Sequence, residues 1–138
     1  MISTRLSRAS AIFLFITGIP LLFASDVILP SVSPAFPADA SWICQLLGAS
    51  WLGVGSLNWL SQSSLLGGIY GRPIVLANLA LYFIGALVLL RVFYDETMPL
   101  GIWFVLVPFV IFALIYGWLL LRGPIMRDFE VNRGGSSA

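Results

Sequence analysis

The chain has 138 residues, of which 59% are hydrophobic and only 9% are charged, and its mean hydropathy is +1.00. A soluble domain carries roughly 25% charged residues, so lipid, and not water, is the expected solvent for most of this surface. The formal net charge is only +1, which excludes the broad basic surface that nucleic-acid binding requires.

Histidine is absent, and Cys44 is the only cysteine. These counts exclude His-ligated haem or chlorophyll, an intrachain disulfide and cysteine-paired metal sites, and they remove the commonest general base at neutral pH. Cys44, Asp26 and Asp39 remain as candidates for catalysis near one membrane surface, although Cys44 is more simply a small apolar residue at a helix end. We therefore expect a protein that is not an enzyme, with no metal and no intrinsic cofactor.

Four apolar blocks contain neither an acidic residue nor an arginine, and they span residues 9–24, 42–60, 74–90 and 100–121. A hydrocarbon core about 30 Å thick needs about 20 helical residues, and the blocks reach this length once their flanks are counted. Charges lie outside the blocks because one at mid-membrane costs roughly 2.5 to 3.5 kcal/mol. The sequence predicts an all-α membrane protein, a single domain over residues 1–138 that forms an antiparallel bundle of four transmembrane helices.

The first block has an alternative interpretation as a secretory signal peptide, because Arg5 and Arg8 precede it. Cleavage after Ala24 would need a small residue two positions earlier, where Leu22 stands. We therefore expect this block to be a membrane helix.

The distribution of arginine predicts the orientation. Six of the seven arginines lie in the N-terminal segment, the second connection and the tail: Arg5, Arg8, Arg72, Arg122, Arg127 and Arg133. The two other connections hold only Arg91. Because arginine is enriched on the cytoplasmic side, we expect a multi-pass protein of the cell inner (cytoplasmic) membrane with both termini in the cytoplasm. The tail, residues 122–138, should be irregular.

The first outward connection, residues 25–41, contains Pro30, Pro34 and Pro37 among apolar residues. We expect it to lie on the outer surface of the bilayer or of a neighbouring protein, with no regular helix through the prolines. The second connection ends at Arg72 and Pro73 after several glycines. It is either a close turn or a site where Arg72 holds a lipid phosphate or another anion.

Small residues recur four positions apart in two blocks: Ala49 and Gly53, with Gly48 and Gly55 close by, and Ala113 and Gly117. This spacing lets two helix backbones approach closely, and in lipid such packing helps to supply the energy of association. We expect these residues to lie at helix contacts, either within the bundle or on a face that binds a second copy or a partner subunit.

Asn58 and Asn78 lie well inside their blocks, near the cytoplasmic ends of consecutive helices. An unpaired carboxamide in hydrocarbon costs several kcal/mol, so a bond between them is expected, worth roughly 1 kcal/mol. Alternatively, the two amides line a pocket for a polar ligand. Trp51, at the middle of the second block, must pack against another helix, a partner or an apolar molecule. These three residues are the candidates for binding a lipid, a quinone or an apolar pigment at a subunit interface.

Three short stretches carry a resemblance to known sequences. The matching residues are Gln45-Leu-Leu-Gly-Ala, Gly53 through Asn58-Trp59, and Gly67-Gly-Ile-Tyr-Gly-Arg-Pro-Ile-Val-Leu-Ala-Asn78-Leu. There the chain resembles a loose group of small, mostly uncharacterised bacterial four-helix integral membrane proteins. The resemblance covers the second and third blocks and implies the four-helix fold, and no activity follows from it.

These features favour a non-enzymatic accessory or structural subunit that packs against a larger membrane complex, such as an energy-converting or photosynthetic one. Its expected partners are membrane lipids and other membrane protein subunits. The alternative is a small transport or apolar-ligand-binding protein that uses Gln45, Asn58 and Asn78 near Trp51. The lack of ionisable residues inside the blocks argues against coupling to protons or ions.

Overall fold

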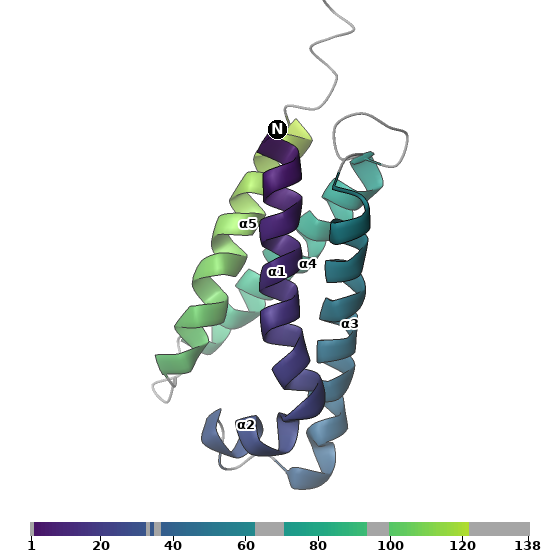
Figure 1. The fold of residues 1–138 in the computed structure, drawn as a ribbon. Coiled ribbons are helices and arrows are strands. Elements are labelled where there is room, and N and C mark those ends of the chain that lie inside the picture. Colours follow the sequence, from purple (N-terminus) through teal and green to yellow (C-terminus); the bar gives the residue numbers. More distant parts are fainter. Residues whose placement is uncertain (1, 33, 35–36, 63–70, 94–99, 122–138) are drawn as a thin grey trace, which may run out of the picture.

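The computed structural model describes residues 2–32, 34, 37–62, 71–93 and 100–121. Over these residues the chain is helical and contains no strand, as the sequence predicts. In chain order the elements are α1 (Ile2–Phe23), α2 (Ser25–Val32), η1 (Ala38–Ala40), α3 (Ser41–Leu60), α4 (Gly71–Phe93), η2 (Leu100–Ile102) and α5 (Trp103–Leu121), as Figure 1 shows. The predicted irregular tail, residues 122–138, lies outside the described residues.

Three helices are long and apolar enough to cross a membrane: Thr4–Phe23 in α1, Gly71–Arg91 in α4 and Trp103–Leu121 in α5. The chain is therefore a membrane protein by the length and composition of its helices. α3 has a comparable length of 20 residues. It is less apolar because Gln45 and Asn58 interrupt a helix that is already rich in glycine and serine.

Helix α2 corrects one prediction, because it is a regular helix that contains Pro30. The chain starts this helix directly after α1, where the Ala24 carbonyl accepts the N–H groups of Val27 and Ile28. Nucleation, the costly step of helix formation, is thus supplied by the preceding residues. Pro30 removes one bond near the end of the helix, and the Ser31 hydroxyl there donates to the Ile28 carbonyl at 2.6 Å.

The four long helices form two closely packed pairs, α1 with α3 and α4 with α5. Near the start of α1, the Ser7 hydroxyl donates to the Asn58 carbonyl near the end of α3. Near the end of α1, Gly18 lies against Gly48 in the first half of α3. The two helices of this pair therefore run in opposite directions, as Figure 1 shows.

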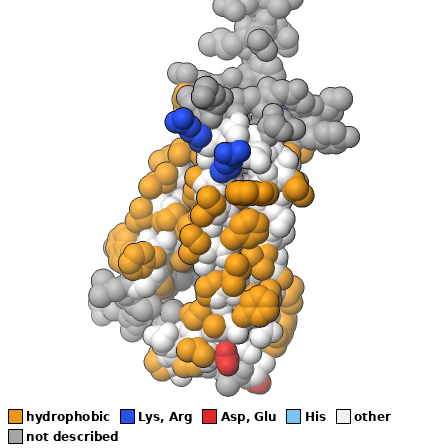
Figure 2. Space-filling model, in the orientation of Figure 1, with side chains coloured by type: hydrophobic (Ala, Val, Ile, Leu, Met, Phe, Trp, Pro, Cys, Tyr) orange, Lys and Arg blue, Asp and Glu red, His pale blue; other side chains and the backbone are white. Residues whose placement is uncertain are grey.

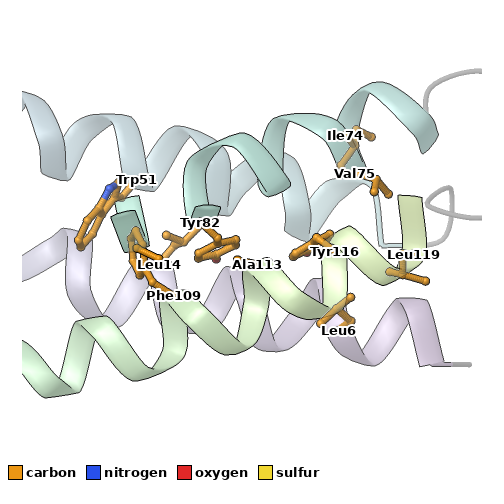
Figure 3. Close-up of a cluster of buried hydrophobic side chains, with 11 residues drawn as sticks. Leu6, Leu14, Trp51, Ile74, Val75, Tyr82, Phe109, Ala113, Tyr116 and Leu119 are labelled. Atoms are coloured by element: carbon orange, nitrogen blue, oxygen red, sulfur yellow. The ribbon is translucent and has the colours of Figure 1, made fainter. Parts of the chain in front are cut away.

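An aromatic core joins the two pairs, and Phe109 of α5 lies at its centre with only 2% of its surface exposed. Its ring centroid lies 6.0 Å from that of Phe13 on α1, 5.4 Å from Trp51 on α3 and 5.1 Å from Tyr82 on α4. Figure 3 shows several of these side chains together. The sequence predicts that Trp51 packs against another helix, a partner or an apolar molecule. In the structure it packs against Phe109 of α5 in the same chain.

Candidate functional site: a buried polar cluster

Six polar side chains meet near one end of the molecule, and none of them is exposed to solvent. They come from all four long helices: Ser7, Ser10, Asn58, Asn78, Tyr82 and Tyr116. We call this group the polar cluster. Polar groups removed from water must bond to one another or lose several kcal/mol, so the hydrogen bonds of this group decide what it can do.

Two reciprocal hydrogen bonds join the carboxamides of Asn58 and Asn78 across α3 and α4. Each Nδ2 donates to the other residue's Oδ1 at 2.7 Å. The second N–H of Asn58 donates to Ser10 Oγ at 2.9 Å, and that of Asn78 donates to the Ile74 carbonyl at 2.9 Å. A carboxamide has two N–H donors. All four donors of the pair are therefore used within the chain.

Two serines bring α1 into the polar cluster. The Ser10 hydroxyl and the Tyr82 hydroxyl lie 2.6 Å apart and share a hydrogen bond, which joins α1 to α4. The Ser7 hydroxyl donates to the Asn58 carbonyl at 2.6 Å, which joins α1 to α3. Ser10 also accepts from Asn58, so one hydroxyl contacts both helix pairs.

Tyr116 is the one member of the polar cluster whose side-chain hydroxyl is buried without a hydrogen-bond partner among the described residues. Its ring stacks on that of Tyr82, with centroids 5.9 Å apart and an angle of 11° between the planes. The ring is therefore held by packing, while the hydroxyl bears an uncompensated cost of desolvation.

The polar cluster is neutral and consists of amides and hydroxyls. It holds helices together through directional bonds, and its asparagines have no donor left to offer a ligand. Of the two interpretations of Asn58 and Asn78, the geometry supports the clamp between helices. In the described part of the chain, no three His, Cys, Asp or Glu side chains form a group that could hold a metal.

The small residues of α3 lie on two sides of the helix, and Gly48 and Gly55, not Ala49 and Gly53, face α1. Gly48 contacts α1 so closely that an added Cβ would lie 2.7 Å from the Gly18 carbonyl oxygen, and Gly55 faces Leu14 of α1. Ala49 is exposed, and Gly53 has nothing within 4 Å of its would-be Cβ.

The reason is helical periodicity. The buried residues of α3 are Gly48, Trp51, Gly55 and Asn58. Their spacing of three, four and three places them on one face, and each step of one residue turns the helix by about 100°. Ala49 and Gly53 lie one and five positions after Gly48 in the sequence. The turn of the helix therefore places them on a different side from the buried face.

On α5 the predicted small residues do lie within the molecule. Ala113 is buried. A Cβ on Gly117 would meet Leu79 of α4 at 3.6 Å. Gly117 therefore lies at the contact between α5 and α4.

The other residues that the sequence singles out stay apart from the polar cluster. Arg72 is exposed in the first turn of α4, and Gln45 is exposed on α3. Cys44 is half-buried, while Asp26 and Asp39 are exposed. Across the described segments, no hydrogen bond joins the cysteine to either acid, so this set offers no assembled catalytic geometry.

Four members of the polar cluster were not predicted from the sequence: Ser7, Ser10, Tyr82 and Tyr116. A signal was present for three of them. Tyr82 follows Asn78 by four positions and Ser10 follows Ser7 by three, and residues at these spacings lie on the same helix face. Polar residues that repeat in this way within or beside an apolar block therefore indicate a buried polar face.

Comparison with known proteins finds no family model that matches this chain, no similar curated protein and no similar solved structure. The resemblance to small bacterial four-helix membrane proteins therefore stays a prediction. The function has to be argued from the molecule itself.

Proposed function

We propose that this chain is a non-enzymatic membrane protein that crosses the bilayer four times and serves as an accessory subunit of a larger membrane complex. The observation that carries the proposal is the outward face of α3. Exposed residues on this helix include Gln45, Ala49, Ser50, Gly53 and Ser56, which lie among the exposed apolar residues Trp42, Leu46, Leu57 and Leu60. Glycine, alanine and serine offer lipid tails little apolar area, whereas in membranes such residues are typical of helix–helix contacts.

The case for a fourth crossing rests on the pairing of α3 with α1. Contacts between the two helices extend from the Ser7–Asn58 bond to the Gly18–Gly48 contact. At 1.5 Å per residue, the 20 residues of α3 extend about 30 Å, which is the thickness of the hydrocarbon core. The two cited contacts lie ten residues apart on α3, which is about 15 Å along the helix axis. An antiparallel helix that packs on a spanning helix over half of the hydrocarbon core lies at the same depth, so we infer that α3 crosses with α1.

Charge supports the proposed orientation in an inner membrane. Figure 2 shows arginine side chains at one end of the molecule and acidic side chains at the other, with an apolar surface between them. Arg5 and Arg8 lie near the start of α1, and Asp26 and Asp39 lie beyond its end. By the positive-inside rule, the end with Arg5 and Arg8 faces the cytoplasm.

A transport or ligand-binding function has less support. It needs free polar groups near Trp51, but the amides of Asn58 and Asn78 are used within the chain. The indole itself is 6% exposed and packs against Phe109. The groups named for this function are thus engaged in holding the molecule together.

Site-specific photo-crosslinking in the native membrane tests the accessory role. A benzophenone amino acid at position 53 should form one dominant crosslink, to a single other membrane protein that copurifies at a fixed stoichiometry. The matched control is position 84 on α4, where Ile84 is 59% exposed and lipid is the expected neighbour. Crosslinking of the chain to itself, equal crosslinking from both positions, or purification as a lone monodisperse protomer would each contradict the proposal.

A further inference from the structure

The two arginines of α4 lie close to its two ends, Arg72 in the first turn and Arg91 in the last. At 1.5 Å per residue they are separated by about 28 Å along the helix axis, close to the thickness of the hydrocarbon core. If α4 spans the membrane, Arg72 therefore lies at the level of lipid headgroups on one side and Arg91 on the other.

Hydrogen bonds place the start of α1 at the same level as the start of α4. Ser7 donates to the Asn58 carbonyl, Asn58 is bonded to Asn78, and Asn78 donates to the Ile74 carbonyl. Figure 3 shows Leu6, Ile74, Val75 and Leu119 gathered at this same end. Arg5, Arg8 and Arg72, the nearest charged neighbours of these residues in α1 and α4, therefore lie at one end, which we call the arginine end.

The charges of the arginine end are not compensated by acids in the part of the chain that the structure describes. Arg5, Arg8 and Arg72 are exposed. The Arg8 Nε donates to Oε1 of Gln62, a neutral group, which leaves the two terminal nitrogens of that guanidinium able to donate elsewhere. The described acids are Asp26 of α2 and Asp39 of η1, and Figure 1 shows α2 at the end opposite to the start of α1.

We propose that the arginine end binds the phosphate of an anionic phospholipid in the adjacent leaflet. Guanidinium groups donate in pairs to phosphate oxygens, and basic residues at the membrane surface attract anionic lipids. The bond that Arg8 donates to Gln62 holds its guanidinium beside the end of α3, so α1 and α3 border the site, and Arg72 of α4 lies at the same end. A phospholipid is the favoured source of the phosphate because the arginines adjoin apolar helices at headgroup depth. The inference requires that α1 and α4 cross the membrane, and it does not depend on the proposed accessory role.

Native mass spectrometry of the purified full chain in detergent micelles tests this inference. The chain is titrated with phosphatidylglycerol and, separately, with phosphatidylcholine. The wild-type chain should prefer phosphatidylglycerol. Each arginine removed should weaken the binding of that lipid about fivefold, so Arg5→Gln/Arg8→Gln should lose most of the preference and Arg72→Gln part of it.

Arg91→Gln is the matched control, since it removes the same charge from the other end of α4 and should leave the preference intact. Inorganic phosphate supplied in a third titration should not displace phosphatidylglycerol. The inference is overturned if the double variant and Arg72→Gln keep the wild-type preference, if Arg91→Gln loses as much, or if free phosphate competes at millimolar concentration. The purified chain carries no partner protein, so its preference for phosphatidylglycerol is measured independently of the accessory role. Failure of one proposal can therefore be distinguished from failure of the other.

Discussion

Asn58 and Asn78 donate to each other in both directions at 2.7 Å, across the boundary between the two helix pairs. This relationship matters because it is a direct polar link between the two helix pairs in the described part of the chain. The Ser10–Tyr82 bond lies beside it, and the aromatic core around Phe109 supplies the rest of the junction. The junction is thus a directional polar contact next to an apolar one.

Replacing either asparagine alone should lower the free energy of unfolding by more than half of the loss caused by replacing both. Asn78→Leu leaves an N–H and the Oδ1 of Asn58 unpaired in a site with no solvent exposure, and we expect a loss of about 1 to 2 kcal/mol in the free energy of unfolding. Asn58→Leu/Asn78→Leu removes the stranded groups as well, so its loss should be smaller than the sum of the single losses. Unfolding in mixed micelles with increasing dodecyl sulfate, followed by circular dichroism, measures these values.

Ser50→Ala serves as the control for the asparagine variants. Its hydroxyl is exposed and bonds only to the Leu46 carbonyl of its own helix, so the change should be within about 0.5 kcal/mol. Strict additivity of the two asparagine substitutions would show that the amides do not act as a pair.

The two glycines of α3 at positions 48 and 53 should respond oppositely to alanine. In Gly48→Ala, the methyl group would lie 2.7 Å from the Gly18 carbonyl oxygen and 2.8 Å from the Leu22 nitrogen. Backbone atoms must then move apart, at a cost of about 1 to 3 kcal/mol. Gly53→Ala meets nothing within 4 Å and should be neutral or slightly stabilising for a lone protomer. The same unfolding assay decides, and an equal loss for both variants would refute the assigned α1–α3 contact.

The sequence predicts the helices well because hydropathy and length are strong physical constraints in lipid. All four apolar blocks correspond to long helices, and α1 begins ahead of its block because Arg5 and Arg8 continue the helix beyond the apolar residues. The Asn58–Asn78 bond was predictable for a similar reason: an amide in hydrocarbon needs a partner, and these two lie at matching depths in consecutive helices.

The sequence leaves open whether the small residues of α3 contact the bundle or a partner, because short spacing motifs do not report which side of a helix is covered. Gly48 and Gly55 are seven positions apart and share a face with Trp51 and Asn58, whereas Ala49 and Gly53 satisfy the four-residue spacing on the opposite side. The α2 helix was not predicted because prolines disfavour a helix in the sequence pattern. The pattern does not show that the Ala24 carbonyl, at the end of α1, accepts the first hydrogen bonds of α2. The α2 error and the open choice between the two faces of α3 both concern three-dimensional context, which composition does not contain.

Gly85→Ala should destabilise the aromatic core. A methyl group at position 85 would overlap the ring of Phe109, and this ring is fixed by Phe13, Trp51 and Tyr82. Overpacking of this kind costs about 1 to 3 kcal/mol. Phe109→Leu alone should also lower stability, but Gly85→Ala/Phe109→Leu should lose less than the sum, because the smaller side chain makes room for the methyl group. Additive losses in the unfolding assay would place the two residues out of contact.

Removing the hydroxyl of Tyr116 should not weaken the protein, whereas removing that of Tyr82 should. Tyr116→Phe deletes a buried hydroxyl that has no partner among the described residues, so stability should stay unchanged or rise by about 1 kcal/mol. Tyr82→Phe, its matched control on the stacked neighbouring ring, deletes the bond to Ser10 at 2.6 Å and should cost about 1 kcal/mol. If Tyr116→Phe instead loses as much as Tyr82→Phe in the unfolding assay, the hydroxyl of Tyr116 makes a bond in the membrane, and the polar cluster holds a further group such as a buried water.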